Sequence, residues 1–164
     1  MERLILLRHG KAEAEAPSGQ DFDRPLAERG RRDAALTARS LVEAGISPDL
    51  VLVSPAARTW QTWEALAPCF PGARVERASM LYHIEPDALL ALVRKEGADA
   101  RAVMVVGHNP GLGLLAAALA QDSAAPPQLK SRLSLGFPTA AAAVIDFEPP
   151  AFQLFIPKAL GGGS

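Results

Sequence analysis

The hydrophobic pattern of the chain alternates between short, uninterrupted apolar runs and longer segments with helical spacing. The apolar runs cover residues 4–7, 50–53 and 102–106. Runs of this kind indicate strands that are buried on both faces of a sheet. Apolar residues at helical spacing predict helices over 26–44, 58–67, 86–96 and 111–121. Strands that alternate with helices in this order predict right-handed βαβ units and a mostly parallel sheet.

The remaining segments complete an α/β prediction. Residues 74–77 form a weaker candidate strand, and residues 140–147 and 152–156 predict an antiparallel hairpin around Pro149-Pro150. Turn-forming residues predict surface loops over 11–25 and 123–128, and Gly45 is the expected end of the first helix. The fold class is therefore a three-layer α/β structure, with a mostly parallel central sheet, flanking helices and a C-terminal antiparallel hairpin.

Size and composition limit the classes of protein to which the chain can belong. The chain of 164 residues suits a single domain, expected over residues 1–160, with residues 161–164 as a flexible tail. A net charge of −1 gives no general attraction to nucleic acid, and a single cysteine excludes an intrachain disulfide. No apolar segment approaches the ~18 residues that a membrane span needs. These features predict a cytoplasmic protein without a nucleic-acid or membrane partner.

Cationic and imidazole side chains follow three of the predicted strands. Arg8 and His9 follow the first strand, Arg58 lies shortly after the second, and His108 follows the strand over 102–106. Ligands of open α/β sheets bind beyond the carboxyl ends of the strands. We therefore expect these four side chains to surround one site, although each of them alone would more often be structural.

The chemistry of this set points to a phosphoryl group. Guanidinium groups match phosphate geometry and bind it bidentately. Arg58 near a helix start is unfavourable beside the positive dipole end, and a bound anion reverses that effect. Neutral imidazole is a nucleophile near neutral pH, and neighbouring arginines are expected to lower the pKa of His9. The residues predict attack by His9 on phosphorus, with His108 donating to the phosphoryl oxygens and water completing hydrolysis.

Three motifs carry a resemblance to a known family. The string Leu7-Arg8-His9-Gly10 after an N-terminal strand is similar to the signature of the histidine phosphatase (phosphoglycerate mutase-like) superfamily. The segment from Val53 to Thr62 resembles the second motif, whose arginine joins the phosphate pocket. The segment from Val106 to Pro110 resembles the motif of the second histidine. Their order and spacing agree over nearly the whole chain.

A fourth segment narrows the branch. Residues 21–30, which contain Asp21 and Arg24, resemble an element of the SixA-like branch. This resemblance implies a compact phosphatase that acts on phosphohistidine of a phosphotransfer protein, or on another phosphomonoester, with neither metal nor other cofactor. It also implies His9 as the nucleophile, with Arg8, Arg58 and His108 in the phosphate pocket. Arg24 and Asn109 are further candidates for phosphate contact, and a surface salt bridge is the competing interpretation of Arg24.

The residue that protonates the leaving group is left open by the sequence. Larger relatives use a glutamate between the second and last motifs, and residues 80–86 of this chain lack the usual pattern. The candidates are Asp21, Glu85 and His83. Glu85 is also placed to cap the helix that Pro86 opens, and Asp21 to orient Arg24. A phosphohistidine leaving group needs less help from an acid, so the missing glutamate fits a P–N substrate.

Other functions compete with this prediction. A small-molecule phosphomonoesterase acting on a sugar phosphate would use the same four residues under a lid, for which residues 11–25 are the main material. A mutase would need a more closed site. A phosphate-binding module without turnover would need the arginines but no nucleophile. A dinucleotide-binding protein is disfavoured, because no glycine-rich fingerprint follows the first strand.

Overall fold

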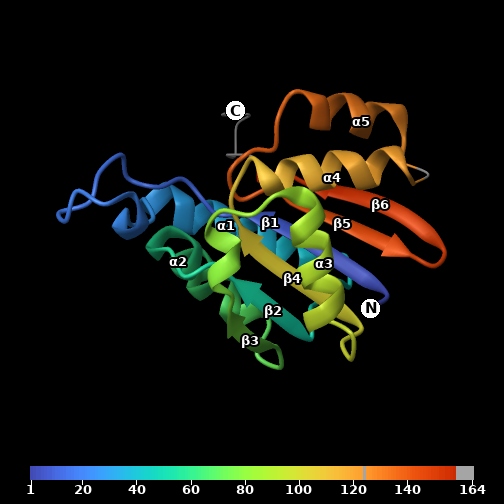
Figure 1. Ribbon diagram of the computed structural model, residues 1–164, viewed down its shortest axis with the longest axis horizontal. Coiled ribbons are helices and arrows are strands. Elements are labelled where there is room, and N and C mark those ends of the chain that lie inside the picture. The colour runs from blue at the N-terminus through green and yellow to red at the C-terminus, as the bar shows by residue number, and fades with distance from the viewer. Residues whose placement is uncertain (124, 158–164) are drawn as a thin grey trace.

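The predicted apolar runs form the centre of a mixed sheet. The computed structural model describes residues 1–123 and 125–157. Its six strands are β1 (Arg3–Arg8), β2 (Leu50–Val53), β3 (Arg74–Arg77), β4 (Ala102–Gly107), β5 (Ala142–Phe147) and β6 (Pro150–Phe155). They lie in the order β3-β2-β4-β1-β5-β6 (Figure 1). The first four in this order are parallel, whereas β5 and β6 form the predicted antiparallel hairpin.

Helices cover both faces of the sheet and make three layers. They are α1 (Glu28–Glu43), α2 (Ala57–Leu66), α3 (Pro86–Glu96), α4 (Gly111–Gln121) and α5 (Pro127–Ser134). Because side chains alternate along a strand, Ile5 and Leu7 of β1 pack in the cluster under α1 and α2, and Leu4 and Leu6 face α3, α4 and α5. All four β1 side chains have 0% exposure, which is the expected burial for a central parallel strand. The predicted fold class is confirmed.

Two predicted boundaries are wrong. The segment predicted as a loop over 123–128 gives way to α5 at Pro127, since proline fits the first turn of a helix. Leu133 is the one buried residue of α5, so the hydrophobic period of this helix is weak. The strand predicted from residue 140 begins at Ala142, because Ala140 has a φ of 60°. The other helix and strand ends lie within two residues of their predictions. The predicted tail over 161–164 lies outside the described residues.

Short 3-10 helices interrupt the connections. They are η1 (Asp21–Asp23), η2 (Ala67–Cys69) and η3 (Ser79–Tyr82). The first lies within the predicted loop over 11–25, which extends beyond one end of the sheet in Figure 1. The segment is joined to the body by a bridge between Ala12 and Leu26. The fold therefore places an ordered loop beside the carboxyl ends of the parallel strands.

The end of α1 confirms the predicted role of Gly45. Its φ of 74° lies in the left-handed region, which glycine adopts without a steric cost. The N–H of Gly45 donates to Val42 O at 3.0 Å, and the N–H of Ile46 donates to Leu41 O at 2.9 Å. These two bonds satisfy helix carbonyls in a Schellman motif and turn the chain toward β2.

The register of the three central strands brings their carboxyl ends together. Arg8 of β1 pairs with Gly107 of β4, and Val53 of β2 pairs with Val106. Backbone bonds continue this alignment past the strands, from His9 N to Gly107 O and from Ser54 N to Val106 O, each 3.1 Å long. The residues that follow β1, β2 and β4 therefore meet at one edge of the sheet.

A close backbone contact fixes the chain just after this edge. A Cβ added to Gly10 would lie 2.6 Å from Gly30 O, and one added to Gly30 would collide with the carbonyl oxygen of Lys11. Both obstacles are backbone atoms, so no side-chain rotation relieves them. Only glycine at these two positions lets α1 pack this tightly against the segment that carries His9.

We predict that Gly30→Ala destabilises the fold. The added methyl group must displace backbone, and overpacking of this kind costs about 1–3 kcal/mol of the free energy of unfolding. Urea denaturation measures the change. Gly72→Ala is the matched control, because nothing lies within 4 Å of a Cβ there. Equal stability of the two variants would contradict the tight-packing argument.

Candidate active site

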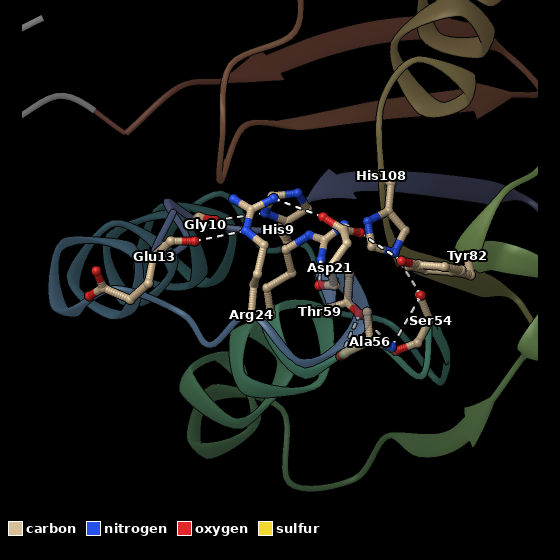
Figure 2. Close-up of polar contacts among 11 residues, drawn as sticks. His9, Gly10, Glu13, Asp21, Arg24, Ser54, Ala56, Thr59, Tyr82 and His108 are labelled. Atoms are coloured by element: carbon tan, nitrogen blue, oxygen red, sulfur yellow. Dashed lines mark hydrogen bonds and ion pairs between the residues drawn. The ribbon is translucent and has the colours of Figure 1, made fainter. Parts of the chain in front are cut away.

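Two imidazoles lie at the carboxyl edge of the central strands. His9 comes directly after β1 and His108 directly after β4, and their ring centroids are 5.4 Å apart (Figure 2). His9 is buried, with 9% exposure. The structure thus brings together the two histidines that the sequence placed after separate strands.

The contacts of His9 define its tautomer. Its Nδ1 lies 2.7 Å from Gly10 O, and a carbonyl oxygen only accepts, so Nδ1 carries the proton. Nε2 then holds the lone pair in the neutral ring. Burial lowers the pKa of His9 to about 4, with further lowering by the charges of Arg58, Arg8 and Arg24. His9 is therefore neutral at pH 7, with a basic nitrogen available for attack.

His108 has one ring nitrogen bonded and one unpaired. Nε2 lies 2.7 Å from Ser54 Oγ, while Nδ1 is buried and has no hydrogen-bond partner among the described residues. Burial lowers the pKa of His108 to about 3, and the positive charge of Arg58 adds to the effect. If the Ser54 hydroxyl donates to Nε2, then Nδ1 carries a hydrogen that can be given to an anion.

Two guanidinium groups flank the imidazoles. Arg8 donates from Nη1 to Phe137 O at 2.8 Å, and its Nε is buried without a partner in the described part of the chain. Arg58 is buried to 7% exposure and donates from both terminal nitrogens to Asp21, at 2.9 and 3.0 Å. Burial and the charge of Arg58 lower the pKa of Arg8. Two cations that repel each other in a partly buried site favour an anion between them.

Asp21 is the carboxylate that joins the loop to this site. It accepts hydrogen bonds from Tyr82 Oη at 2.6 Å, Arg24 Nη1 at 2.9 Å and Arg58 Nη2 at 3.0 Å (Figure 2). The bonds from Tyr82, Arg24 and Arg58 hold the pKa of Asp21 well below its usual range. An ionised carboxyl has no proton to give, so Asp21 is unsuited to the predicted role of proton donor.

The other predicted residues have different places. Arg24 forms the ion pair with Asp21 and donates from Nε to Glu13 O at 2.8 Å, as the salt-bridge interpretation requires. Both polar atoms of the Asn109 side chain are bonded, to Phe137 O and to Gly113 N, each at 3.0 Å. Asn109 thus ties the β4–α4 connection to Phe137, and its phosphate contact stays a prediction. Glu85 is exposed at the N-cap of α3 without a side-chain capping bond, so its predicted cap is wrong.

Sequence reasoning missed three contributors to the site. Ser54 follows β2 directly and bonds His108, a position that its motif already marked. Thr62 accepts the Gly10 N–H at 3.0 Å and donates to Arg58 O at 2.7 Å, and thereby links two of the phosphate motifs. Tyr82 is the single tyrosine of the chain, and no pattern in the sequence indicated its contact with Asp21.

Among residues 1–123 and 125–157, no cluster of three or more His, Cys, Asp or Glu side chains is arranged to hold a metal ion. Over the same residues, no helix combines the length and hydrophobicity that crossing a membrane requires.

The fold and site together define a class of α/β protein that binds a phosphoryl group between paired histidines and arginines. The model of the histidine phosphatase superfamily (branch 1) matches residues 4–84. An uncharacterised protein of Mycobacterium tuberculosis is 36% identical over 140 residues, which cover 85% of both chains. The chain belongs to the histidine phosphatase superfamily, and it is a phosphatase.

Solved structures place the chain within the superfamily. A protein of Agrobacterium tumefaciens assigned as the phosphohistidine phosphatase SixA superposes with a TM-score of 0.83 and 33% identity, over 95% of this chain and 98% of its own. The protein histidine phosphatase SixA in complex with tungstate superposes with a TM-score of 0.74 and 26% identity, over 94% and 97% of the two chains. The protein is therefore SixA-like.

We predict that the buried histidines make the fold acid-sensitive. Unfolded histidine takes up a proton near pH 6.5, whereas folded His9 does so only near pH 4. The unfolded state binds more protons between these values, so the free energy of unfolding falls as the pH falls through this window. In phosphate-free buffer, His9→Ala reduces the slope by up to about 1.4 kcal/mol per pH unit, as measured by urea denaturation.

The titration of Asp21 can be distinguished from that of the histidines by its pH range. The pKa of Asp21 is lowered on folding, so its stabilising contribution is lost only as the pH falls below about 4, the value for an unfolded aspartate. The slope above pH 4 therefore reports on the histidines. Parallel slopes for the wild type and His9→Ala would show that folded His9 titrates as it does in the unfolded chain.

Proposed function

We propose that this phosphatase works through a phosphohistidine intermediate on His9, without a metal ion, and that its substrate is phosphohistidine of a phosphotransfer protein. The observation that carries the mechanism is the state of His9. Its ring is neutral, its Nδ1 is fixed on Gly10 O, and the ring lies beside that of His108 and close enough to Arg58 and Arg8 for their charges to lower its pKa. This arrangement supplies a nucleophile and its surrounding cations at one point.

The steps follow from these positions. Nε2 of His9 attacks phosphorus, and the bond from phosphorus to the leaving group breaks in line with the attack. Arg8 and Arg58 stabilise the charge on the equatorial oxygens, where the unpaired Arg8 Nε and His108 Nδ1 supply two further donors. Water then attacks the phosphohistidine and returns His9 to its neutral form.

The similarity to SixA proteins and the demands of the leaving group support a phosphohistidine substrate. The chain is similar in sequence and structure to SixA proteins, one of which is described as a protein histidine phosphatase. The carboxyl group nearest the phosphate site, Asp21, is held ionised by its three partners and so lends no proton. A phosphoryl group on the imidazole of a partner protein depends less on a strong acid than an alkyl phosphate does. These observations together favour a protein-borne P–N substrate.

We predict that His9→Ala abolishes turnover. With p-nitrophenyl phosphate in the presence of EDTA, the wild type hydrolyses the ester, and the variant loses at least about 10³-fold in kcat. Rapid quenching at alkaline pH traps an acid-labile phosphoenzyme in the wild type alone. Arg39→Ala, at an exposed position of α1, is the control for handling and stability. Phosphate binding without hydrolysis would favour a sensor, and loss of activity in EDTA would overturn the metal-independent mechanism.

A substrate panel separates the two phosphatase alternatives. The panel compares a phosphohistidine-bearing phosphotransfer domain with sugar phosphates at equal concentration, and reports kcat/KM for phosphate release. We expect the phosphoprotein to be preferred by at least about 10-fold, since discrimination by one set of contacts commonly reaches this size. A preference for a sugar phosphate would make the protein a small-molecule phosphomonoesterase, with the same His9 chemistry.

A further inference from the structure

A small cavity adjoins the phosphate site on the side of His108. Its volume is about 170 Å³, and its walls come from η3, the segment between η3 and α3, the β4–α4 connection and the start of α4. Sites for drug-sized ligands occupy roughly 300–1,000 Å³. This cavity is smaller than that, so it suits a single ring or side chain, and it shares His108 with the proposed phosphate site. The lining includes Tyr82, His83, Ile84, Glu85, His108 and Leu114.

His83 is held in this cavity by an aromatic contact. The ring of Tyr82 lies 4.2 Å from the ring of His83 and 5.5 Å from that of His108, measured between centroids. The Tyr82 hydroxyl is fixed in turn on Asp21 Oδ2. His83 is close enough to His108 that its charge contributes to lowering the pKa of His108. The Asp21–Tyr82 pair thus positions an imidazole beside the phosphate pocket.

The remaining acid candidates are less suited than His83. Asp21 is held ionised by Tyr82, Arg24 and Arg58. Glu85 also lines the cavity, but it lacks a capping bond, and no contact among the described residues orients its carboxyl group. His83 is exposed as well, so water can solvate its protonated form, while its ring is oriented by Tyr82. Imidazole is the side chain most often used for proton transfer in catalysis.

We propose that His83 protonates the leaving group in the cavity beside His108, an inference that rests on the proposed phosphatase mechanism. As the bond forms between His9 Nε2 and phosphorus, the bond from phosphorus to the leaving atom breaks, and the proton of the His83 imidazolium passes to that atom. Neutral His83 then accepts a proton from the water that attacks the phosphohistidine, and His9 leaves phosphorus with its electron pair. Both steps balance in atoms and charge, and His83 regains its proton.

The test varies the basicity of the leaving group in His83→Gln. Three esters are compared by kcat/KM: p-nitrophenyl phosphate, phenyl phosphate and glycerol phosphate. The variant loses less than about 3-fold on the nitrophenyl ester, whose leaving group needs no proton, and about 10²-fold on the alkyl ester, the size of general acid catalysis. Asp87→Asn in the first turn of α3, outside the cavity, leaves all three values unchanged.

The pH profile supplies a readout that a structural defect does not move. With phenyl phosphate, we expect the pH profile of kcat/KM in the wild type to contain a limb that His83→Gln lacks, because the variant has no proton to donate. The charged and titratable groups around His83 are Tyr82 and Glu85 on its own segment, His108 after β4, Asp21 in η1 and Arg58 in α2. Glu85→Gln, measured in parallel, shows whether the limb belongs to that carboxyl instead.

Each outcome decides one question. An equal loss on all three esters, or no loss on any, overturns the role of His83, and a leaving-group dependence that follows Glu85→Gln instead assigns it to that residue. Failure of the proposed function looks different, because the wild type would then form no phosphoenzyme even with p-nitrophenyl phosphate. Phosphoenzyme formation by both the wild type and His83→Gln, with divergent leaving-group dependence, supports the proposal.

Discussion

Positive charge that is buried beside neutral imidazoles is the constraint on which this site depends. Arg8 and Arg58 are held among His9, His108 and the strand ends, with Asp21 as the carboxylate bonded to Arg58. The same burial that disfavours two adjacent guanidiniums keeps both imidazoles unprotonated. In the proposed mechanism, a phosphoryl group relieves the repulsion between the cations and leaves His9 free to attack. In this mechanism, the affinity of the site for an oxyanion and the nucleophilicity of His9 both result from burial beside the two arginines.

The sheet makes this arrangement possible because its central strands stop in register. His9, Ser54 and His108 need no long insertion to meet, since the residues after β1, β2 and β4 are adjacent as soon as the strands pair. Gly10 and Gly30 then allow α1 to pack against the turn that carries His9. Thr62 of α2 bonds both Gly10 N and Arg58 O, so one hydroxyl links the backbone after His9 to the first turn of α2. Backbone packing and this hydroxyl together fix the chain around His9 and Arg58.

The sequence predicted those features that depend on periodicity or on strand direction. The buried runs at 4–7, 50–53 and 102–106 leave few alternatives to a parallel sheet, and the four site residues follow from where the runs end. Helix α5 was missed because a single buried residue leaves no period, and its prolines resemble those of a loop. Tyr82 was missed for a different reason, since its bond to Asp21 joins two irregular segments that are 61 positions apart. Contacts between loops depend on the tertiary fold and leave no local pattern.

His9 and His83 differ in their exposure to solvent, and the proposed mechanism gives them different roles. His9 is buried among cations and keeps the neutral form that a nucleophile needs, whereas His83 is exposed and lines the cavity next to His108. Asp21 serves both regions, since it holds Arg58 on one side and orients the Tyr82 ring against His83 on the other. A carboxylate that is too well bonded to give up a proton can still hold the Tyr82 ring against His83, the donor that we propose. Its ionisation, which disqualifies it as an acid, lets it accept bonds from Arg58 and Tyr82 together.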